Sequence, residues 1–127
     1  MKILYDLDGV ICEDIKEAPG TVDYERALQS ATLLRTPNSA VDVIITGRTE
    51  NYRETTEKWL KKHGIYNKLI MKPINLKGIE NTPKYKSEKY LQENGAIYIE
   101  SDSFQAEKIW QLSGKAVFCI ENGVLYI

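Results

Sequence analysis

Histidine and cysteine are both scarce in this chain of 127 residues, which contains one histidine and two cysteines. With only His63, a Ser-His-Asp triad or a histidine-ligated metal site has little support. Cys12 and Cys119 form no Cys-x-x-Cys motif and no disulfide framework. Neither cysteine has the arginine spacing of cysteine-based phosphatases, and no glycine-rich nucleotide loop is present. Low cysteine usage predicts a reducing, cytoplasmic setting.

Long apolar runs are also missing, because no stretch approaches the ~20 residues that a membrane-spanning helix needs. An acidic residue at position 6 argues against a signal peptide. The length and a composition of 43% hydrophobic and 28% charged residues predict one globular domain over residues 1–127. The net charge of -1 is unevenly spread, since nine lysines and two acids lie between Lys58 and Lys89. Such a stretch is most often a solvated face, and the alternative is attraction of an anionic substrate.

Short apolar runs alternate with amphipathic segments along the chain, which predicts an α/β fold with a parallel sheet. We expect strands at residues 3–5, 41–45, 69–71, 96–99 and 116–120, and helices at 22–34 and 103–113. A further helix is expected between a Thr49 cap and Gly64, and another from a Thr82 cap, with Pro83 in its first turn, to Asn94. Asn122-Gly123 predicts a tight C-terminal hairpin.

Asp6 and Asp8 directly follow the first predicted strand, at the edge where open α/β sheets place their ligands. Carboxylates this close repel each other, so the pair needs a cation or a shared proton. Mg²⁺ suits oxygen ligands of this kind, and one Asp could then act as nucleophile and the other as proton donor. The alternative is a turn that is merely acidic. A calcium-binding EF-hand loop fits less well, because Val10 stands where a third oxygen ligand is needed.

Polar residues follow two further predicted strands, and a lysine lies early in the helix after Thr82-Pro83. The chain resembles the haloacid dehalogenase-like (HAD) superfamily in the order of four motifs. These are Asp6-Leu-Asp-Gly-Val10, Ile45-Thr46-Gly-Arg48, Tyr85-Lys86-Ser-Glu-Lys-Tyr-Leu91 and Ile97-Tyr-Ile-Glu-Ser-Asp102. The resemblance implies a Rossmann-like three-layer sandwich with five parallel strands in the order 3-2-1-4-5, a C-terminal hairpin and no cap domain. It also implies a Mg²⁺-dependent phosphatase.

The same resemblance implies the catalytic roles. Asp6 would attack phosphorus and carry an aspartyl-phosphate, while Asp8 would protonate the leaving oxygen and then help to deprotonate water. The Thr46 hydroxyl would contact the phosphoryl group, and Lys86 would neutralise the cluster of charges. Gly47 and Arg48 are expected to bind substrate.

The magnesium ion would lie among Asp6, the backbone carbonyl of Asp8 and an acid of the fourth motif. That motif departs from the usual family pattern, because its acids alternate as Glu100-Ser101-Asp102. An ungapped alignment from the strand puts Glu100 at the metal position, whereas an alignment on Asp-Ser puts Asp102 there. The ungapped alignment is favoured, and with it Glu100.

A second similarity concerns the substrate. The segments 46–53, 57–65 and 69–73 are similar to the phosphatase half of phage polynucleotide kinase, which removes 3′-phosphates from nucleic acid ends. A nucleotide or a nucleic-acid end is therefore one expected substrate, and a small phosphorylated metabolite is the other. Family members without a cap act on bulky substrates or close the site by forming homo-oligomers. The rival from another class is a catalytically silent HAD-like binding module.

Overall fold

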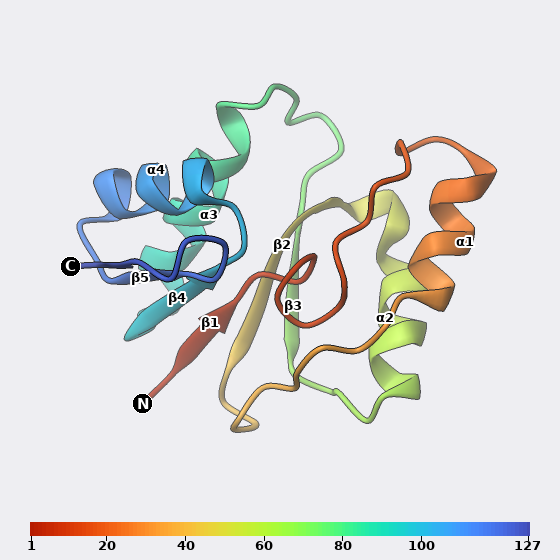
Figure 1. The fold of residues 1–127 in the computed structure, drawn as a ribbon, viewed down its shortest axis with the longest axis horizontal. Coiled ribbons are helices and arrows are strands. Elements are labelled where there is room, and N and C mark those ends of the chain that lie inside the picture. Colours follow the sequence, from red (N-terminus) through yellow and green to blue (C-terminus); the bar gives the residue numbers. More distant parts are fainter.

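A six-stranded sheet crosses the middle of the molecule, with helices on both of its faces (Figure 1). The computed structural model describes residues 1–127. The strands lie in the order β3-β2-β1-β4-β5-β6. They are β1 (Ile3–Tyr5), β2 (Val43–Thr49), β3 (Lys68–Lys72), β4 (Ile97–Glu100), β5 (Val117–Cys119) and β6 (Leu125–Tyr126). The helices are α1 (Val22–Ser30), α2 (Arg53–Lys62), α3 (Asn81–Glu93) and α4 (Ser103–Ser113), with a 3-10 turn over Glu50–Tyr52.

The two faces of the sheet bury separate clusters of apolar side chains. Successive side chains of a strand point to opposite faces, so neighbouring residues of β1 enter different clusters. Leu4 packs with Tyr90 and Ile109 on the face covered by α3 and α4. Tyr5 packs with Trp59 and other residues on the face covered by α2. The predicted α/β class is thus confirmed, with the sheet as the central layer.

The sheet differs from the prediction in its number of strands. Five strands are parallel, as β1 pairs with β2 and β4, β2 with β3, and β4 with β5. The C-terminal hairpin adds β6 antiparallel to β5, so the sheet has six strands and its order extends beyond the predicted five. Gly123 adopts a φ of 68°, a conformation that glycine reaches without steric cost, and this turn folds β6 back onto β5.

The first helix is shorter than predicted. Amphipathic spacing continues to Leu34, but α1 ends at Ser30. The next residues leave the helix because they find partners in the loop that follows β1. The Leu34 N–H donates to the Ile11 carbonyl at 2.7 Å, and Glu13 N–H donates to Thr32 at 2.9 Å. Tertiary pairing therefore overrides the helical pattern of these residues.

No separate domain is inserted into the α/β fold. The segment between β1 and α1 is a loop whose first residues are fully buried against the sheet, including Leu7, Val10 and Ile11. The intervals between β2 and β4 hold only α2, β3, α3 and their loops. The carboxyl ends of the parallel strands therefore open directly to solvent. None of the helices has the length and apolar character required to cross a membrane.

Candidate active site

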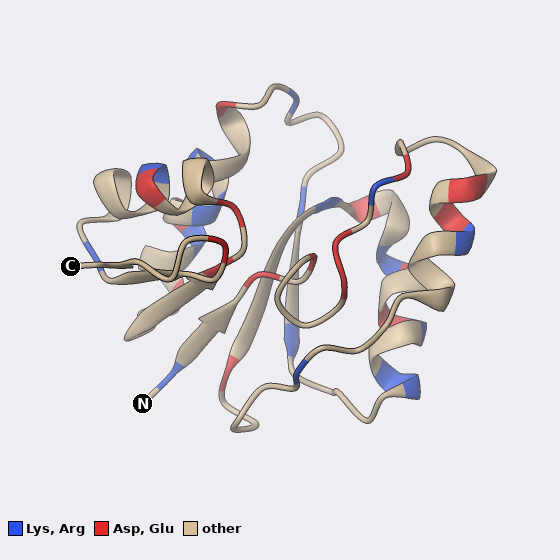
Figure 2. Cartoon of the chain, in the orientation of Figure 1, with Lys and Arg blue, Asp and Glu red and all other residues tan.

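The carboxyl ends of β1, β2 and β4 and the first turns of α3 surround one polar cavity of about 470 Å³. None of its lining residues is hydrophobic. They are Asp6, Asp8, Gly9, Asp14, Gly47, Arg48, Thr82, Lys86, Glu100, Ser101, Asp102, Gln105 and Glu121. Figure 2 shows acidic segments in the loop after β1 and in the turn between β4 and α4, and basic segments at the end of β3. Such a lining suits a charged ligand.

Asp6 lies directly beyond β1, at the bottom of the cavity. Its backbone N–H donates to Ile99 at 2.8 Å, which continues the pairing of β1 with β4. Its carboxylate accepts hydrogen bonds from the Leu7 N–H at 2.8 Å and from the Ser101 hydroxyl at 3.2 Å. Burial, and then the charge of Glu100, raise the pKa of Asp6 well above its ordinary value. A cation beside this carboxylate would favour the ionised form that a nucleophile needs.

Lys86 supplies one such cation from α3. Its Nζ lies 3.2 Å from Asp6 Oδ1 and 2.9 Å from Glu100 Oε1. The side chains of the three residues are only 3%, 6% and 1% exposed, in the order Lys86, Asp6, Glu100. Burial opposes the charge on Lys86, but the two carboxylates outweigh burial and raise the pKa of its amine above the usual range. The three groups form a buried charge triad with the lysine protonated.

Glu100 and Asp102, the two alternative metal ligands, are bonded differently. Glu100 Oε1 accepts from Lys86, and Glu100 Oε2 accepts from the backbone N–H groups of Ser101 at 3.0 Å and Asp102 at 3.1 Å. Burial opposes ionisation of Glu100, but Lys86 and these hydrogen bonds prevail and lower its pKa. Asp102 caps α4 through Oδ2, which accepts from the Gln105 N–H at 2.9 Å. Asp102 Oδ1 accepts no hydrogen bond from the protein, so it is more available to a metal ion than either Glu100 oxygen.

Asp8 lies at the mouth of the cavity and is held by Arg48. The guanidinium Nη2 is 2.6 Å from Asp8 Oδ1, and Nε is 3.1 Å from Oδ2. Arg48 is itself fixed, because Nη1 donates to the Thr56 hydroxyl at 3.1 Å and its side chain is only 3% exposed. The Cys12 thiol lies 3.4 Å from Asp8 Oδ1, and burial raises the pKa of this thiol. Arg48, which we expected to bind substrate, thus orients the Asp8 carboxylate.

A register irregularity between β2 and β3 brings Arg48 to the cavity. Thr46 pairs with Met71, and the next pair is Thr49 with Lys72, so Gly47 and Arg48 form a bulge. Thr46 is fully buried, and its hydroxyl accepts from the Arg48 N–H at 3.1 Å. Thr46 therefore lies below the cavity and does not line it. All the other predicted site residues do.

Glycine is required at one point of the lining. Gly9 has a φ of 80°, and a Cβ there would lie 2.7 Å from the Ser101 Cβ. At Gly47 the fit is tight, because a Cβ would lie 3.0 Å from the Thr82 Cγ2, whereas the Lys86 Cε at 3.9 Å would be in ordinary contact.

Several lining residues were not singled out from the sequence. Ser101 contacts Asp6 and lies within the fourth motif, so its position between two acids was an available signal. Thr82 was interpreted only as a helix cap, whereas α3 begins one residue before it. Asp14, Gln105 and Glu121 carry no signal in the sequence, because the loop after β1, the first turn of α4 and the turn after β5 bring them to the cavity.

The donor set allows a hard cation but does not form a closed site. No three His, Cys, Asp or Glu side chains converge as a ready-made metal centre. In the lining, Asp102 Oδ1 and the backbone carbonyl of Asp8 accept no hydrogen bond from the protein, so both oxygens remain available. Mg²⁺ is commonly held by one or two carboxylates together with water and substrate phosphate, so an incomplete oxygen site fits this ion.

Two solved structures of the Pnkp1/Rnl/Hen1 complex contain chains with a fold similar to this one. The first, of the Pnkp1/Rnl/Hen1 RNA repair complex, superposes with a TM-score of 0.67 at 22% identity, over 94% of this chain and 42% of the matched chain. The second, also of the Pnkp1/Rnl/Hen1 complex, has a TM-score of 0.66 at 19% identity, over 94% and 45% respectively. At these identities the similarity shows a shared fold. This chain spans less than half of each matched chain.

Comparison by sequence adds no family. No family model matches the chain. No curated protein matches it either.

Proposed function

We propose that this protein is a Mg²⁺-dependent phosphatase of the HAD type that acts on phosphorylated nucleic-acid ends. The main support is the triad of Asp6, Lys86 and Glu100 at the bottom of an open cavity with a fully polar lining. A carboxylate fixed against a buried ammonium is an oriented nucleophile, and the same cation can neutralise an incoming phosphoryl group.

The reaction would have two steps. An Asp6 oxygen attacks phosphorus and the bond from phosphorus to the leaving oxygen breaks, while Asp8 gives its proton to that oxygen. A water molecule then attacks the phosphorus of the aspartyl-phosphate, passes its proton to Asp8, and releases phosphate and Asp6. Arg48 would keep the Asp8 carboxyl in place for both proton transfers, because it contacts both Asp8 oxygens. Lys86 would stabilise the charge on the transferring group.

Asp6, the Asp8 backbone carbonyl and Asp102 would hold the magnesium ion. When bound, it would neutralise phosphoryl charge and orient the phosphate for in-line attack. Asp102 is a better ligand than our initial choice, Glu100, because both Glu100 oxygens already accept hydrogen bonds from the protein. Glu100 would instead hold Lys86 in position beside the nucleophile.

Two similarities favour a nucleic-acid end as the substrate. The fold is similar to chains in structures of an RNA repair complex. The segments 46–53, 57–65 and 69–73 resemble the phosphatase half of phage polynucleotide kinase. The cavity also opens directly to solvent, so the end of a long chain can enter it. The matched chains belong to complexes, and assembly with partners or into a homo-oligomer remains a prediction for this protein.

The decisive experiment measures Mg²⁺-dependent hydrolysis of p-nitrophenyl phosphate and of a 3′-phosphorylated RNA oligonucleotide. Asp6→Asn should reduce both rates by about a thousandfold, because it removes the nucleophile. Asp23→Asn is the matched control, since it makes the same chemical change on the exposed part of α1. Activity of Asp6→Asn within about tenfold of the wild type would refute the covalent mechanism.

The alternatives predict other results. A phosphatase of small metabolites would hydrolyse p-nitrophenyl phosphate and leave the oligonucleotide intact. A silent binding module would bind the 3′-phosphorylated oligonucleotide without hydrolysing either substrate.

A further inference from the structure

Lys72 is a partly buried cation without an acidic partner at the edge of the proposed active site. It ends β3, and its Nζ donates to the Thr82 hydroxyl at 3.0 Å. Thr82 in turn lines the cavity. Lys72 belongs to none of the ion pairs of this structure, in contrast to Lys68 at the other end of the same strand, which lies 2.7 Å from Glu93.

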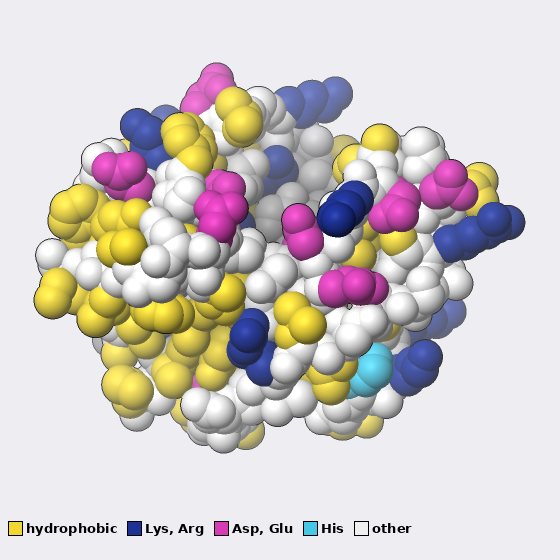
Figure 3. Space-filling view, in the orientation of Figure 1, with side chains coloured by type: hydrophobic (Ala, Val, Ile, Leu, Met, Phe, Trp, Pro, Cys, Tyr) yellow, Lys and Arg dark blue, Asp and Glu magenta, His cyan; other side chains and the backbone are white.

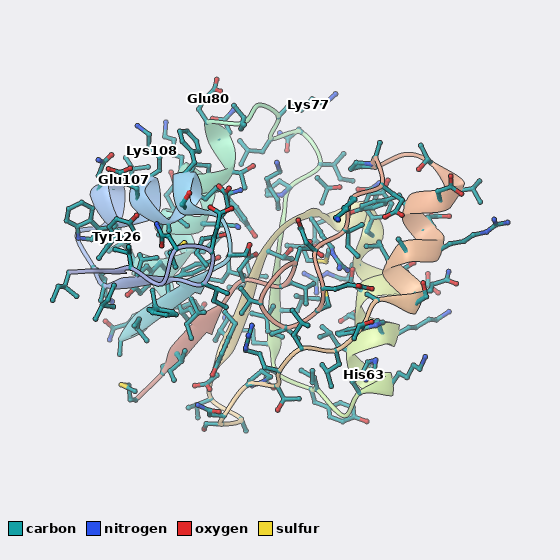
Figure 4. The ribbon with its side chains drawn as sticks, viewed as in Figure 1. His63, Lys77, Glu80, Glu107, Lys108 and Tyr126 are labelled. Carbon is teal, nitrogen blue, oxygen red and sulfur yellow. The ribbon has the colours of Figure 1, made fainter.

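The surroundings of Lys72 make its positive charge unfavourable when no anion is bound. Burial, and then the nearby charge of Lys86, lower the pKa of the Lys72 amine. Two lysines that repel each other across Thr82 form a place where an anion would be stabilised. The tip of the following loop is different, because Lys77 and Glu80 both project from it and carry opposite charges (Figure 4). Lys72 is therefore the cation without an acidic partner at the base of this loop, beside the cavity.

The other side of the cavity is acidic. Asp102 follows β4, and Glu121 follows β5. Asp14 also lines the cavity but lies toward β3, because the next residue, Ile15, packs against the cluster that contains Met71. Since β3 and β5 lie on opposite sides of β1 in the sheet, Lys72 and Glu121 stand at opposite sides of the site. In the space-filling view, acidic side chains border the hollow in the middle of the face, with basic side chains among them (Figure 3).

We infer that Lys72 and Thr82 form a second anion subsite, which binds the phosphodiester next to the terminal phosphate of a nucleic-acid strand. The inference rests on the proposed phosphatase function for the position of the terminal phosphate beside Asp6. A strand held in this way leaves the cavity over β3, because the acids on the side of β4 and β5 repel its phosphates. The site therefore recognises a terminal phosphate together with the charged phosphodiester next to it.

The test uses a fluorescent 3′-phosphorylated dinucleotide and its methylphosphonate analogue, in which the linkage is uncharged. Binding is measured by anisotropy with Mg²⁺ in the Asp6→Asn background, so that the ligand stays intact. Lys72→Gln should weaken binding of the dinucleotide by about tenfold, which corresponds to one charge-assisted contact of ~1.4 kcal/mol. It should weaken binding of the methylphosphonate analogue by less than about twofold, because that linkage offers no charge. The difference should shrink as salt is added.

Lys68→Gln is the matched control, because it removes the same charge from the opposite end of β3. It should change neither affinity by more than about twofold, since exposed ion pairs contribute little. Equal losses for the two ligands in Lys72→Gln would overturn the inference, and so would the absence of any loss. An affinity too weak to measure in the Asp6→Asn background would also overturn it.

Turnover separates this inference from the proposed function. Suppose that the otherwise unmodified protein hydrolyses p-nitrophenyl phosphate but that Lys72→Gln has no selective effect on dinucleotide binding. The phosphatase function would then be supported and the second anion subsite refuted. A selective loss of dinucleotide binding in Lys72→Gln, without turnover of any phosphomonoester, would support the subsite and refute the phosphatase function.

Discussion

Replacing Lys86 with methionine should destabilise the protein, because it leaves the two carboxylates of the triad without a cation. The substitution keeps the length and apolar stem of the side chain but removes a charge that lies within 3.2 Å of Asp6 and 2.9 Å of Glu100. Two carboxylates that are at most 6% exposed would then face each other without a cation. Breaking a buried ion pair on one side typically costs 3 to 5 kcal/mol, so we expect a loss of about 4 kcal/mol in the free energy of unfolding at neutral pH.

The pH dependence of this loss has a definite sign. In the folded wild type the pKa of Asp6 is raised and that of Glu100 is lowered, and Lys86 favours the ionised form of both. Without Lys86 both pKa values rise. A raised carboxyl pKa means that the folded state binds more protons than the unfolded state, so stability falls as the pH rises above the unfolded value. The deficit of Lys86→Met should therefore grow between about pH 4 and pH 7.

Urea unfolding followed by circular dichroism measures this deficit at both ends of the pH range. Lys84→Met is the matched control, because the same substitution is made at an exposed position of the same helix. It should change stability by no more than about 0.5 kcal/mol at either pH. A deficit below about 1 kcal/mol for Lys86→Met at neutral pH, or one that shrinks as the pH rises, would refute the triad as described.

Three further predictions test other parts of the site. Asp8→Asn should slow hydrolysis of alkyl phosphates about tenfold more than that of p-nitrophenyl phosphate, whose leaving group needs no proton; equal losses in steady-state rates would contradict the acid role. Asp102→Asn should raise the half-saturating Mg²⁺ concentration about tenfold in activity titrations, and a larger rise for Glu100→Gln would return the ligand role to Glu100. Gly9→Ala should lower the free energy of unfolding by about 2 kcal/mol in urea titrations, because its φ is 80° and the new Cβ would meet Ser101; an unchanged midpoint would refute this.

The location of the candidate site could be predicted from the sequence because it depends on local patterns. Apolar runs that end in Asp6, Thr46 and Glu100 are strands, and their alternation with helices makes them parallel. Parallel strands connected by right-handed crossovers place all their carboxyl ends at one edge of the sheet. The helix α4 was predicted with the bounds that the structure shows, from Ser103 to Ser113, because Gly114 stops it in the left-handed conformation.

Contacts between distant segments could not be predicted in the same way. The bond from Ser101 to Asp6 joins residues that are 95 positions apart, and the pairing of Arg48 with Asp8 spans 40 positions. Such contacts depend on strand register and side-chain rotamers, which a single sequence does not reveal. The bulge at Gly47 and Arg48 is an example, because it exists only where β2 slips against β3.

The sequence by itself thus determined the α/β class, the edge of the sheet that bears the site, and the residue types gathered there, because these follow from hydrophobic periodicity and chain connectivity. Only the tertiary structure decided what each charged group contacts. It placed Lys86 between Asp6 and Glu100 and paired Arg48 with Asp8. It gave Lys72 a hydroxyl partner and no acidic one. The physical reason is that electrostatic partnership depends on distances of a few ångströms, and packing between elements far apart in the chain sets those distances.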